Sequence, residues 1–345
     1  MNTTQDNFGY VDRAYDEALI EEPMTKDTKK EILLVSGAVG ITLIVFMLLG
    51  TGIALGARQL YASGALPQTF NVGCILQIIY SLCAVLLPFF LCYLAIQKIQ
   101  KRTDYIPMNK PNSWNWFGMA VCIGFLSLIV LNFATSYFSL FLENFGISFG
   151  TSDIESPSNV SGYIWMVVGD AIVPALCEEF AFRGVVLQSF RKYGDSMAIG
   201  ISALLFAILH GNMNQAPFAF LLGLVIGRLV IATGSIWTGI GIHLLNNTYA
   251  IVLTSINHHA TGLTLVAASI IINTVGIAAG LIAGIWLIGY YKALSPKHLY
   301  KPGGNFPAAQ RTYRRQAWLY TLISLPMTAS VIWLLKTLIE TIQLK

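Results

Sequence analysis

Long apolar stretches separated by short polar segments run through most of the chain. A helix needs about 20 apolar residues to cross the hydrocarbon core of a bilayer. Nine stretches approach or meet that length: residues 32–57, 72–96, 114–142, 161–190, 196–211, 216–233, 235–257, 262–291 and 317–339. The fifth and sixth are the shortest, so they are compatible with tilted, broken or re-entrant helices. The pattern predicts an all-α, polytopic transmembrane helix bundle of about eight to nine spans.

Composition supports this fold class. Hydrophobic residues make up 55% of the 345 residues and charged residues only 11%, whereas a soluble domain carries about 25% charged residues. We expect residues 32–345 to form a single transmembrane helical domain. Residues 1–31, which hold no apolar run, are expected to form a polar cytoplasmic tail that stays attached. The five cysteines all lie in apolar stretches, where we expect them to be packing residues.

Basic residues gather before the first predicted span and after the second, fourth and eighth. Because cytoplasmic loops are enriched in Lys and Arg, we predict a multi-pass protein of a cell membrane with a cytoplasmic N-terminus. The C-terminus is then outside. Nucleic acid is excluded as a partner because the basic residues alternate with spans instead of forming one surface, and membrane lipid is favoured. The basic loop residues are Lys26, Lys29, Lys30, Lys98, Lys101, Arg102, Lys110, Arg191, Lys192, Lys292, Lys297, Lys301, Arg311, Arg314 and Arg315, with Arg58 as the exception in an intervening loop.

Small residues repeat every four positions on two of the predicted spans. Gly276, Gly280 and Gly284 do so on the eighth span, and Gly223 and Gly227 on the sixth. Helices in lipid approach closely at such residues. These glycines therefore predict helix packing and carry no chemistry.

Few charged residues fall within the nine stretches. An ionisable side chain inside a bilayer costs a few kcal/mol on the mildest scales and is a functional-site hypothesis by default. Asp170, which precedes Pro174, is interpreted as a residue that steadies a kinked helix, and Arg228 as one that reaches to the cytoplasmic interface. The complete set is Asp170, Glu178, Glu179, Arg183, Arg228 and Lys336.

Three of these charged residues lie within six positions of one another. Glu179 and Arg183 are four apart, so on a helix they share a face and are expected to form an ion pair with a structural role. Glu178 is rotated by about 100° from Glu179. Its partner must therefore come from another helix.

Two of the five histidines, His210 and His243, fall within predicted spans, whereas His258, His259 and His298 are expected in loops. At 1.5 Å per residue, Glu178, His210, His243 and Asn247 lie roughly 20, 24, 12 and 18 Å from the cytoplasmic ends of their helices. His243 and Asn247 also share a helix face. An intramembrane histidine alone more often bridges helices through hydrogen bonds. Together, the four residues can activate water and bind an oxyanion.

Three short motifs occur in order over consecutive predicted spans. "EEFAFR" is E-E-x-x-x-R, "FAILH" is F-x-x-x-H and "HLLNN" contains H-x-x-x-N. Together they resemble the signature motifs of the CPBP family of membrane-embedded proteases, which includes CAAX proteases and bacteriocin-processing proteins and is also called the Abi family. The resemblance covers about residues 160–255, the predicted spans four to seven.

The resemblance implies a metal-independent glutamate protease. In that family the first glutamate and the second-motif histidine activate a water, which here are Glu178 and His210. His243 and Asn247 would bind the oxyanion, and Glu179 and Arg183 would orient the site, with Glu179 as a further aid to the water. Zinc is not favoured, although Glu plus two His is a credible zinc set, because the chain has no H-E-x-x-H. No cofactor is expected.

The implied function is an intramembrane endopeptidase that hydrolyses a peptide bond of a peptide or lipid-modified protein substrate. The family's distribution favours a bacterial plasma membrane. An alternative is a non-catalytic membrane scaffold or bacteriocin-immunity protein that binds a partner membrane protein through the same cavity. A transporter that uses Glu178 and His210 as a proton relay is less favoured, because the sequence shows no inverted repeat.

Overall fold

The computed structural model describes residues 24–103, 105–111, 113–149, 156–259, 261–294 and 308–344. Most of the predicted N-terminal tail, His298 and the basic residues Lys297 and Lys301 lie outside the described residues. The helices are α2 (Lys26–Ala62), α3 (Phe70–Tyr80), α4 (Leu87–Gln100), α5 (Trp114–Glu143), α6 (Val160–Met166), α7 (Val173–Glu179), α8 (Leu187–Arg191), α9 (Asp195–Leu209), α10 (Ala216–Thr233), α11 (Ile236–His259), α12 (Gly262–Leu294), α13 (Ala308–Leu322) and α14 (Leu325–Ile339).

Three π-helical segments and one small sheet complete the described elements. The π-helical segments are η1 (Ser81–Leu86), η2 (Val167–Ile172) and η3 (Phe180–Val186), and they join α3 to α4, α6 to α7 and α7 to α8. Strands β1 (Ile147–Phe149) and β2 (Ile342–Leu344) pair antiparallel, with Ser148 opposite Gln343. The fold is therefore an all-α helix bundle with one short sheet, as predicted.

Fewer helices pass a test of length and hydropathy than the nine apolar stretches of the sequence. Within the described residues six helices are long and apolar enough to cross a membrane, or seven if α13 and α14 form one bent span. The prediction of a continuous ninth span over 317–339 is wrong, because the chain bends by 71° between Leu322 and Leu325. Pro326 begins the new helix there, and a proline is tolerated only in a first turn. The chain is a multi-pass membrane protein.

Two other predicted spans fall short for different reasons. The fifth stretch forms α9, which has only 15 residues and so rises about 22 Å, less than the hydrocarbon thickness. The seventh forms α11, which has 24 residues but is not among the helices that are apolar enough. The polar run from His243 to Asn247 lies in α11 and lowers its hydropathy. The second and third motifs thus lie on helices that depart from a simple span, whereas the E-E-x-x-x-R motif lies in one that is long and apolar enough.

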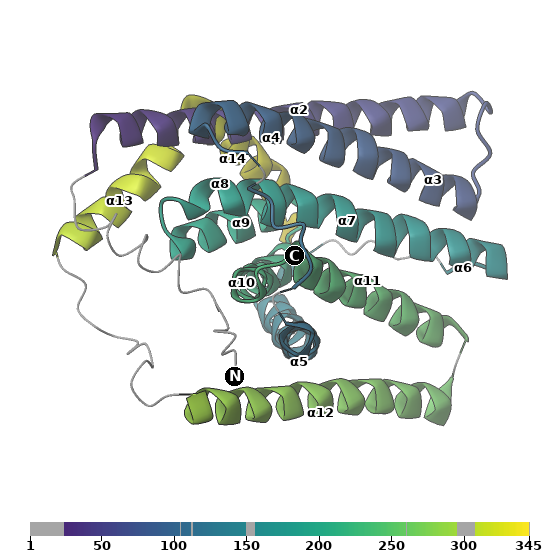
Figure 1. Ribbon diagram of the computed structural model, residues 1–345. Coiled ribbons are helices and arrows are strands. Elements are labelled where there is room, and N and C mark those ends of the chain that lie inside the picture. The colour runs from purple at the N-terminus through teal and green to yellow at the C-terminus, as the bar shows by residue number, and fades with distance from the viewer. Residues whose placement is uncertain are drawn as a thin grey trace.

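Helices α2 and α12 lie on opposite sides of the bundle, with α7 to α11 between them (Figure 1). Gly280 and Gly276 of α12 lie against α5, where a Cβ on Gly276 would be 2.5 Å from side chains of Phe125 and Ile129. A Cβ on Gly284 would meet no atom of the described neighbouring residues within 4 Å. The predicted small-residue packing of α12 is confirmed for two of its three glycines.

Glycines also allow close helix packing on α10. A Cβ on Gly223 would lie 3.1 Å from Ala203, and one on Gly227 would lie 3.2 Å from Leu187. Both glycines therefore let α10 approach α8 and α9 closely. This packing sets the position of α9, the helix that ends at His210.

One end of the bundle collects several of the basic connections. There, at the start of α2, Glu31 accepts hydrogen bonds from Lys192 (2.8 Å) and Tyr193 (2.7 Å) beside the α8–α9 turn. Gln100, at the end of α4, donates to the carbonyl of Ser189 (2.9 Å). Burial, together with the Glu31 carboxylate, raises the pKa of the Tyr193 hydroxyl, so this group stays a neutral donor. We call this end, defined by Glu31, Gln100 and Tyr193, the basic end.

Two of the π-helical segments precede a proline. The Val173 amide donates to the Val168 carbonyl, five residues back, and Pro174 follows at the start of α7. Leu87 and Leu82 repeat this arrangement before Pro88. Since proline donates no backbone hydrogen bond, a wider turn before it lets the span continue. Segment η3 holds no proline and carries Arg183, and π-helical turns occur frequently at functional sites.

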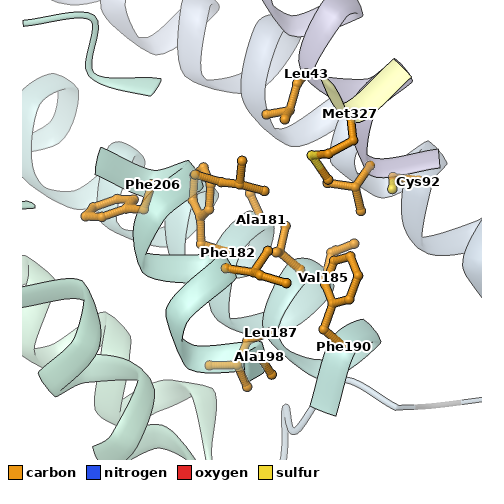
Figure 2. Close-up of a cluster of buried hydrophobic side chains, with 14 of the residues drawn as sticks. Leu43, Cys92, Ala181, Phe182, Val185, Leu187, Phe190, Ala198, Phe206 and Met327 are labelled. Atoms are coloured by element: carbon orange, nitrogen blue, oxygen red, sulfur yellow. The ribbon is translucent and has the colours of Figure 1, made fainter. Parts of the chain in front are cut away.

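The hydrophobic core fixes η3 and α8 between the flanking helices. Figure 2 shows Phe182, Val185 and Phe190 among side chains that include Leu43 of α2 and Met327 of α14. The Phe182 ring lies 5.5 Å from Phe89 and 5.1 Å from Phe206 between ring centroids. A continuous aromatic contact therefore leads from the core to Phe206, which borders the polar cluster described next.

Candidate active site

A fully buried ion pair forms the inner side of the polar cluster. Arg183 Nη1 donates to Glu179 Oε1 at 2.8 Å, and both side chains are 0% exposed. The i, i+4 pair predicted from the sequence is confirmed. Glu179 Oε2 and two other nitrogens of Arg183 have no hydrogen-bond partner within the described residues. Breaking such a pair by removing one partner costs about 3–5 kcal/mol, so its position is well determined.

His243 of α11 connects the two glutamates of the E-E-x-x-x-R motif. Its Nδ1 lies 2.9 Å from Glu179 Oε1, and its Nε2 lies 3.9 Å from Glu178 Oε2. Because a carboxylate only accepts, the Nδ1–H of His243 donates to Glu179. The predicted partner of Glu178 from another helix is therefore His243. The Glu178 side chain is 22% exposed, in contrast to that of Glu179.

Gly239 allows α11 to approach Glu179. A Cβ on Gly239 would overlap Glu179 Oε2, and it would also lie 3.0 Å from Val230. Gly239 is one helical turn before His243, so the close approach of the two backbones and the His243–Glu179 bond occur together. Any larger residue at Gly239 must displace the glutamate or the helix.

Phe206 of α9 lies between the two histidines. Its ring centroid is 4.8 Å from that of His210 and 5.7 Å from that of His243, both edge-on. The Arg183 guanidinium carbon lies 4.4 Å from the same centroid, a favourable cation–π geometry. The structure thus brings His210 and His243 to the same aromatic ring, and their shared depth in the membrane stays a prediction.

His210 lies at the C-terminal cap of α9 and is exposed. The prediction that it lies inside a span is wrong, because α9 ends one residue earlier and Gly211 follows with a positive φ of 59°. His210 Nδ1 is 2.7 Å from the carbonyl oxygen of Phe206. Because a carbonyl only accepts, Nδ1 carries the hydrogen. In the neutral ring Nε2 is then an unprotonated base that can accept a hydrogen bond from water.

No direct hydrogen bond or ion pair joins Glu178 to His210 within the described part of the chain. Glu178 lies beside His243, His210 lies beside Phe206, and the Phe206 and His243 rings contact each other. The Glu178 side chain is partly open to the surroundings and that of His210 is exposed. A water-activating pair requires room for a water between its members. The arrangement has two exposed bases on one side and a buried ion pair on the other.

Asn247 lies four residues after His243 on α11. Its side-chain oxygen accepts a hydrogen bond of 3.1 Å from Asn246 Nδ2. That orientation leaves the Asn247 Nδ2 hydrogens free to donate to a substrate oxygen. An amide donor of this kind can stabilise an oxyanion.

The remaining charged and histidine positions are placed as follows. Arg228 is exposed on α10, as its interpretation requires. Lys336 lies 3.8 Å from Glu340 near the end of α14, with 75% of its side chain exposed. His259, at the end of α11, has its Nδ1 3.0 Å from the Ser255 carbonyl. Residues His210 and His259 thus make the same local bond, a turn back along their own helices.

Possible metal ligands are few in the polar cluster. No group of three or more His, Cys, Asp or Glu side chains in the described ranges is arranged to hold a metal ion. Glu178 and His243 approach each other, but a structural or catalytic zinc site takes at least three protein ligands. Glu178 and His243 alone therefore supply fewer ligands than a zinc ion takes.

Three residues of the cluster, Phe206, Gly239 and Asn246, are not assigned a role from the sequence alone. Phe206 was visible as the first letter of F-x-x-x-H, but its contacts with Arg183 and both histidines needed coordinates. Gly239 and Asn246 carry no motif signal. The only hints in the sequence are that Gly239 is four residues before His243, and that Asn246 is adjacent to Asn247.

Comparison with known proteins gives one finding. Residues 160–249 match the family model "Type II CAAX prenyl endopeptidase Rce1-like", which is 90 of the 345 residues. Neither the curated proteins nor the solved structures give a match. The matched segment contains α6 to α10 and the part of α11 that includes His243 and Asn247. Residues 160–249 of the chain are therefore similar to an Rce1-like domain of the CAAX prenyl endopeptidase type.

Proposed function

We propose that the protein is an intramembrane endopeptidase that hydrolyses a peptide bond of a lipid-modified peptide or protein. The observation that carries the proposal is the unequal environment of two adjacent carboxylates. Glu179 is buried and bonded to Arg183 and His243, whereas Glu178 is partly open and faces His243 at 3.9 Å. The family match supports the reaction class, because the matched description is that of a prenyl endopeptidase.

The proposed reaction begins with a water held between Glu178 and His210 Nε2. Glu178 takes a proton from the water as the hydroxyl oxygen bonds to the carbonyl carbon of the substrate. The carbonyl oxygen becomes an oxyanion, to which Asn247 Nδ2–H donates. When His243 carries protons on both nitrogens, its Nε2–H is a second donor. The carbon–nitrogen bond then breaks, and the proton on Glu178 passes to the leaving amine.

Glu179 and Arg183 act on the position of His243 in this proposal. The Glu179 carboxylate fixes the His243 ring through Nδ1. Arg183 holds that carboxylate through the ion pair, and its guanidinium lies against the Phe206 ring. A hydrogen-bonded carboxylate behind an imidazole sets both its orientation and the nitrogen that faces the substrate. No metal or cofactor takes part in the proposed steps.

An apolar groove beside the site is the proposed location of the substrate's lipid chain. It has a volume of about 380 Å³ and lies between α5, α7 and α11, lined by Phe117, Ala175, Leu176 and Leu244 among others. Trp114 of α5 and Trp237 of α11 also line the groove, and Trp237 donates to the Met108 carbonyl at 3.0 Å. Such a groove excludes a charged occupant and accommodates an isoprenyl chain.

We also propose the orientation of the chain in a cell membrane. The basic end, with Lys192 and the other Lys and Arg residues of the neighbouring loops, would face the cytoplasm. The polar N-terminal residues 1–31 would then be cytoplasmic, and residues 32–345 would form one membrane domain. A bacterial plasma membrane is the proposed location.

The direct test uses purified protein in liposomes and a farnesylated peptide that ends in a C-a-a-X sequence. Intact protein should release the last three residues, identified by mass spectrometry, and Glu178→Ala should release none while remaining inserted and folded. Undiminished release by Glu178→Ala would contradict the assignment. A peptide with the same sequence and no lipid tests the groove, since its KM should be higher.

A non-catalytic scaffold or immunity protein is the second candidate. The observation in its favour is that Glu178 and His210 share no direct bond. If the protein only binds a partner, the Glu178→Ala form should restore the phenotype of a deletion strain. An endopeptidase predicts that it does not.

A further inference from the structure

Asp170 is an acid in the middle of a membrane helix that the proposed reaction does not use. It lies in η2, eight residues before Glu178, and its side chain is neither fully buried nor fully exposed. Among the described residues no group forms a hydrogen bond or ion pair with it. An unpaired carboxylate in a bilayer is costly. Its retention therefore needs an explanation other than packing.

The helix kink does not supply that explanation. The wide turn before Pro174 is closed by backbone atoms, with the Val173 amide donating to the Val168 carbonyl. The Asp170 carboxylate takes no part in this bond. The interpretation of Asp170 as a residue that steadies the kink is therefore not needed to account for the geometry.

The segments that carry Asp170 and Glu178 pack along one neighbouring span. A Cβ on Gly169 would lie 2.9 Å from the Cys74 backbone, so η2 and α3 are in close contact there. Helix α7, which carries Glu178, packs against η1, the direct continuation of α3. The two acidic residues thus lie about two helical turns apart beside the same span, with Glu178 nearer the basic end.

We propose that Asp170 is a subsite that binds a cationic side chain of the peptide substrate. This rests on the proposed function and names a specificity determinant for it. Eight residues of helix separate the two carboxylates by about 12 Å or slightly less. An extended peptide covers that distance in three to four residues at about 3.3 Å each. The cationic residue therefore lies three or four positions from the cleaved bond.

The physical reason is the balance of charge in a medium of low polarity. An unpaired carboxylate strongly favours an ammonium or guanidinium partner once water is excluded. A neutral side chain of the same length gains nothing there. The preference should therefore be selective for charge and should depend on the Asp170 carboxylate alone.

The experiment uses a set of farnesylated, fluorescence-quenched peptides in which one lysine is moved through the positions around the cleaved bond. The matched peptides carry norleucine in place of lysine. Intact protein should cleave one lysine peptide, with the lysine three or four residues from the bond, about 10-fold better in kcat/KM than its norleucine partner. Asp170→Asn should lose that preference and Asp170→Glu should keep it.

Controls separate recognition from folding. Glu143→Gln removes an exposed acid at the last residue of α5 and should leave the preference unchanged. Asp170→Asn should cleave the norleucine peptide at the rate of intact protein. Equal loss of both peptides in Asp170→Asn, or the absence of any lysine preference in intact protein, would overturn the proposal.

The same peptides distinguish this proposal from the proposed function. If intact protein cleaves none of them, binding to intact protein is measured instead. Tighter binding of one lysine peptide that is lost in Asp170→Asn would support the subsite although hydrolysis had failed. Equal binding of lysine and norleucine peptides would overturn the subsite independently of catalysis.

Discussion

The polar cluster has a closed side and an open side, and the two differ in how their charges are satisfied. On the closed side, Glu179 and Arg183 are 0% exposed and are held by each other, by His243 and by the Phe206 ring. On the open side, Glu178 and His210 are accessible, and His210 keeps Nε2 free. Adjacent residues of one helix thus face different environments.

The difference teaches which residues determine structure and which are available for chemistry. A charge that is buried in an ion pair cannot change its protonation or position without a large free-energy cost. A base with a free lone pair and access to water can. The predictions below test this division, starting with the largest expected effect.

Replacing the open glutamate should separate activity from stability. Glu178→Gln keeps the shape of the side chain but removes the base, so hydrolysis of a farnesylated peptide should fall by about 10³-fold or more. Thermal unfolding should be unchanged. Glu179→Gln should instead lower both the rate of hydrolysis and the temperature of unfolding, since it leaves Arg183 without its partner. Equal loss of thermal stability in Glu178→Gln and Glu179→Gln would contradict the division into a structural closed side and a reactive open side.

Removing the second base should have a smaller effect. His210→Ala is expected to reduce kcat by about 10²-fold because the water loses one of its two hydrogen-bond acceptors. Stability should change little because the side chain is exposed. His259→Ala is a matched control, since His259 is also exposed and also bonds the carbonyl four residues back. A similar fall in kcat for His259→Ala would contradict the role of His210.

Breaking the closed side should be visible in unfolding. Arg183→Met is expected to lower the free energy of unfolding by about 3 kcal/mol, because the buried Glu179 loses its counter-charge. The double variant with Glu179→Gln should recover part of that loss. Chemical denaturation in detergent measures both. Additive losses in the double variant would show that the two side chains do not act as a pair.

The smallest effect should come from a single methyl group. Gly239→Ala places a Cβ against Glu179 Oε2 and should shift His243, which we expect to reduce kcat about 10-fold. Gly241→Ala lies on the same helix, and its Cβ would be 3.5 Å from Val121, an ordinary contact. Its kcat should be unchanged. Peptide hydrolysis compares the two, and an equal fall would point to general damage to α11.

Hydropathy predicted the helix class and most helix positions because burial in lipid acts on every residue of a span. It did not predict where helices break. The bend near Pro326 and the end of α9 at His210 depend on local backbone conformation, which average hydropathy does not record. Six or seven helices of the described residues therefore pass the test of length and hydropathy, against nine apolar stretches in the sequence.

The candidate site shows the same limit at the level of single residues. The Glu179–Arg183 pair follows from helix periodicity, so it could be predicted. The bond from His243 to Glu179 joins residues 64 apart in sequence, and spacing along one helix says nothing about such a bond. The sequence reasoning placed His243 with Asn247 at the oxyanion, and the structure adds that its Nδ1 is already engaged.

The most direct test of the division between the two sides is a comparison of peptide termini in whole membranes. Membranes that carry intact protein and membranes that carry Glu178→Gln, matched for the amount of folded protein, are analysed for newly formed termini by mass spectrometry. The account predicts termini that are present with intact protein and missing with Glu178→Gln. The same termini in both membranes would contradict it.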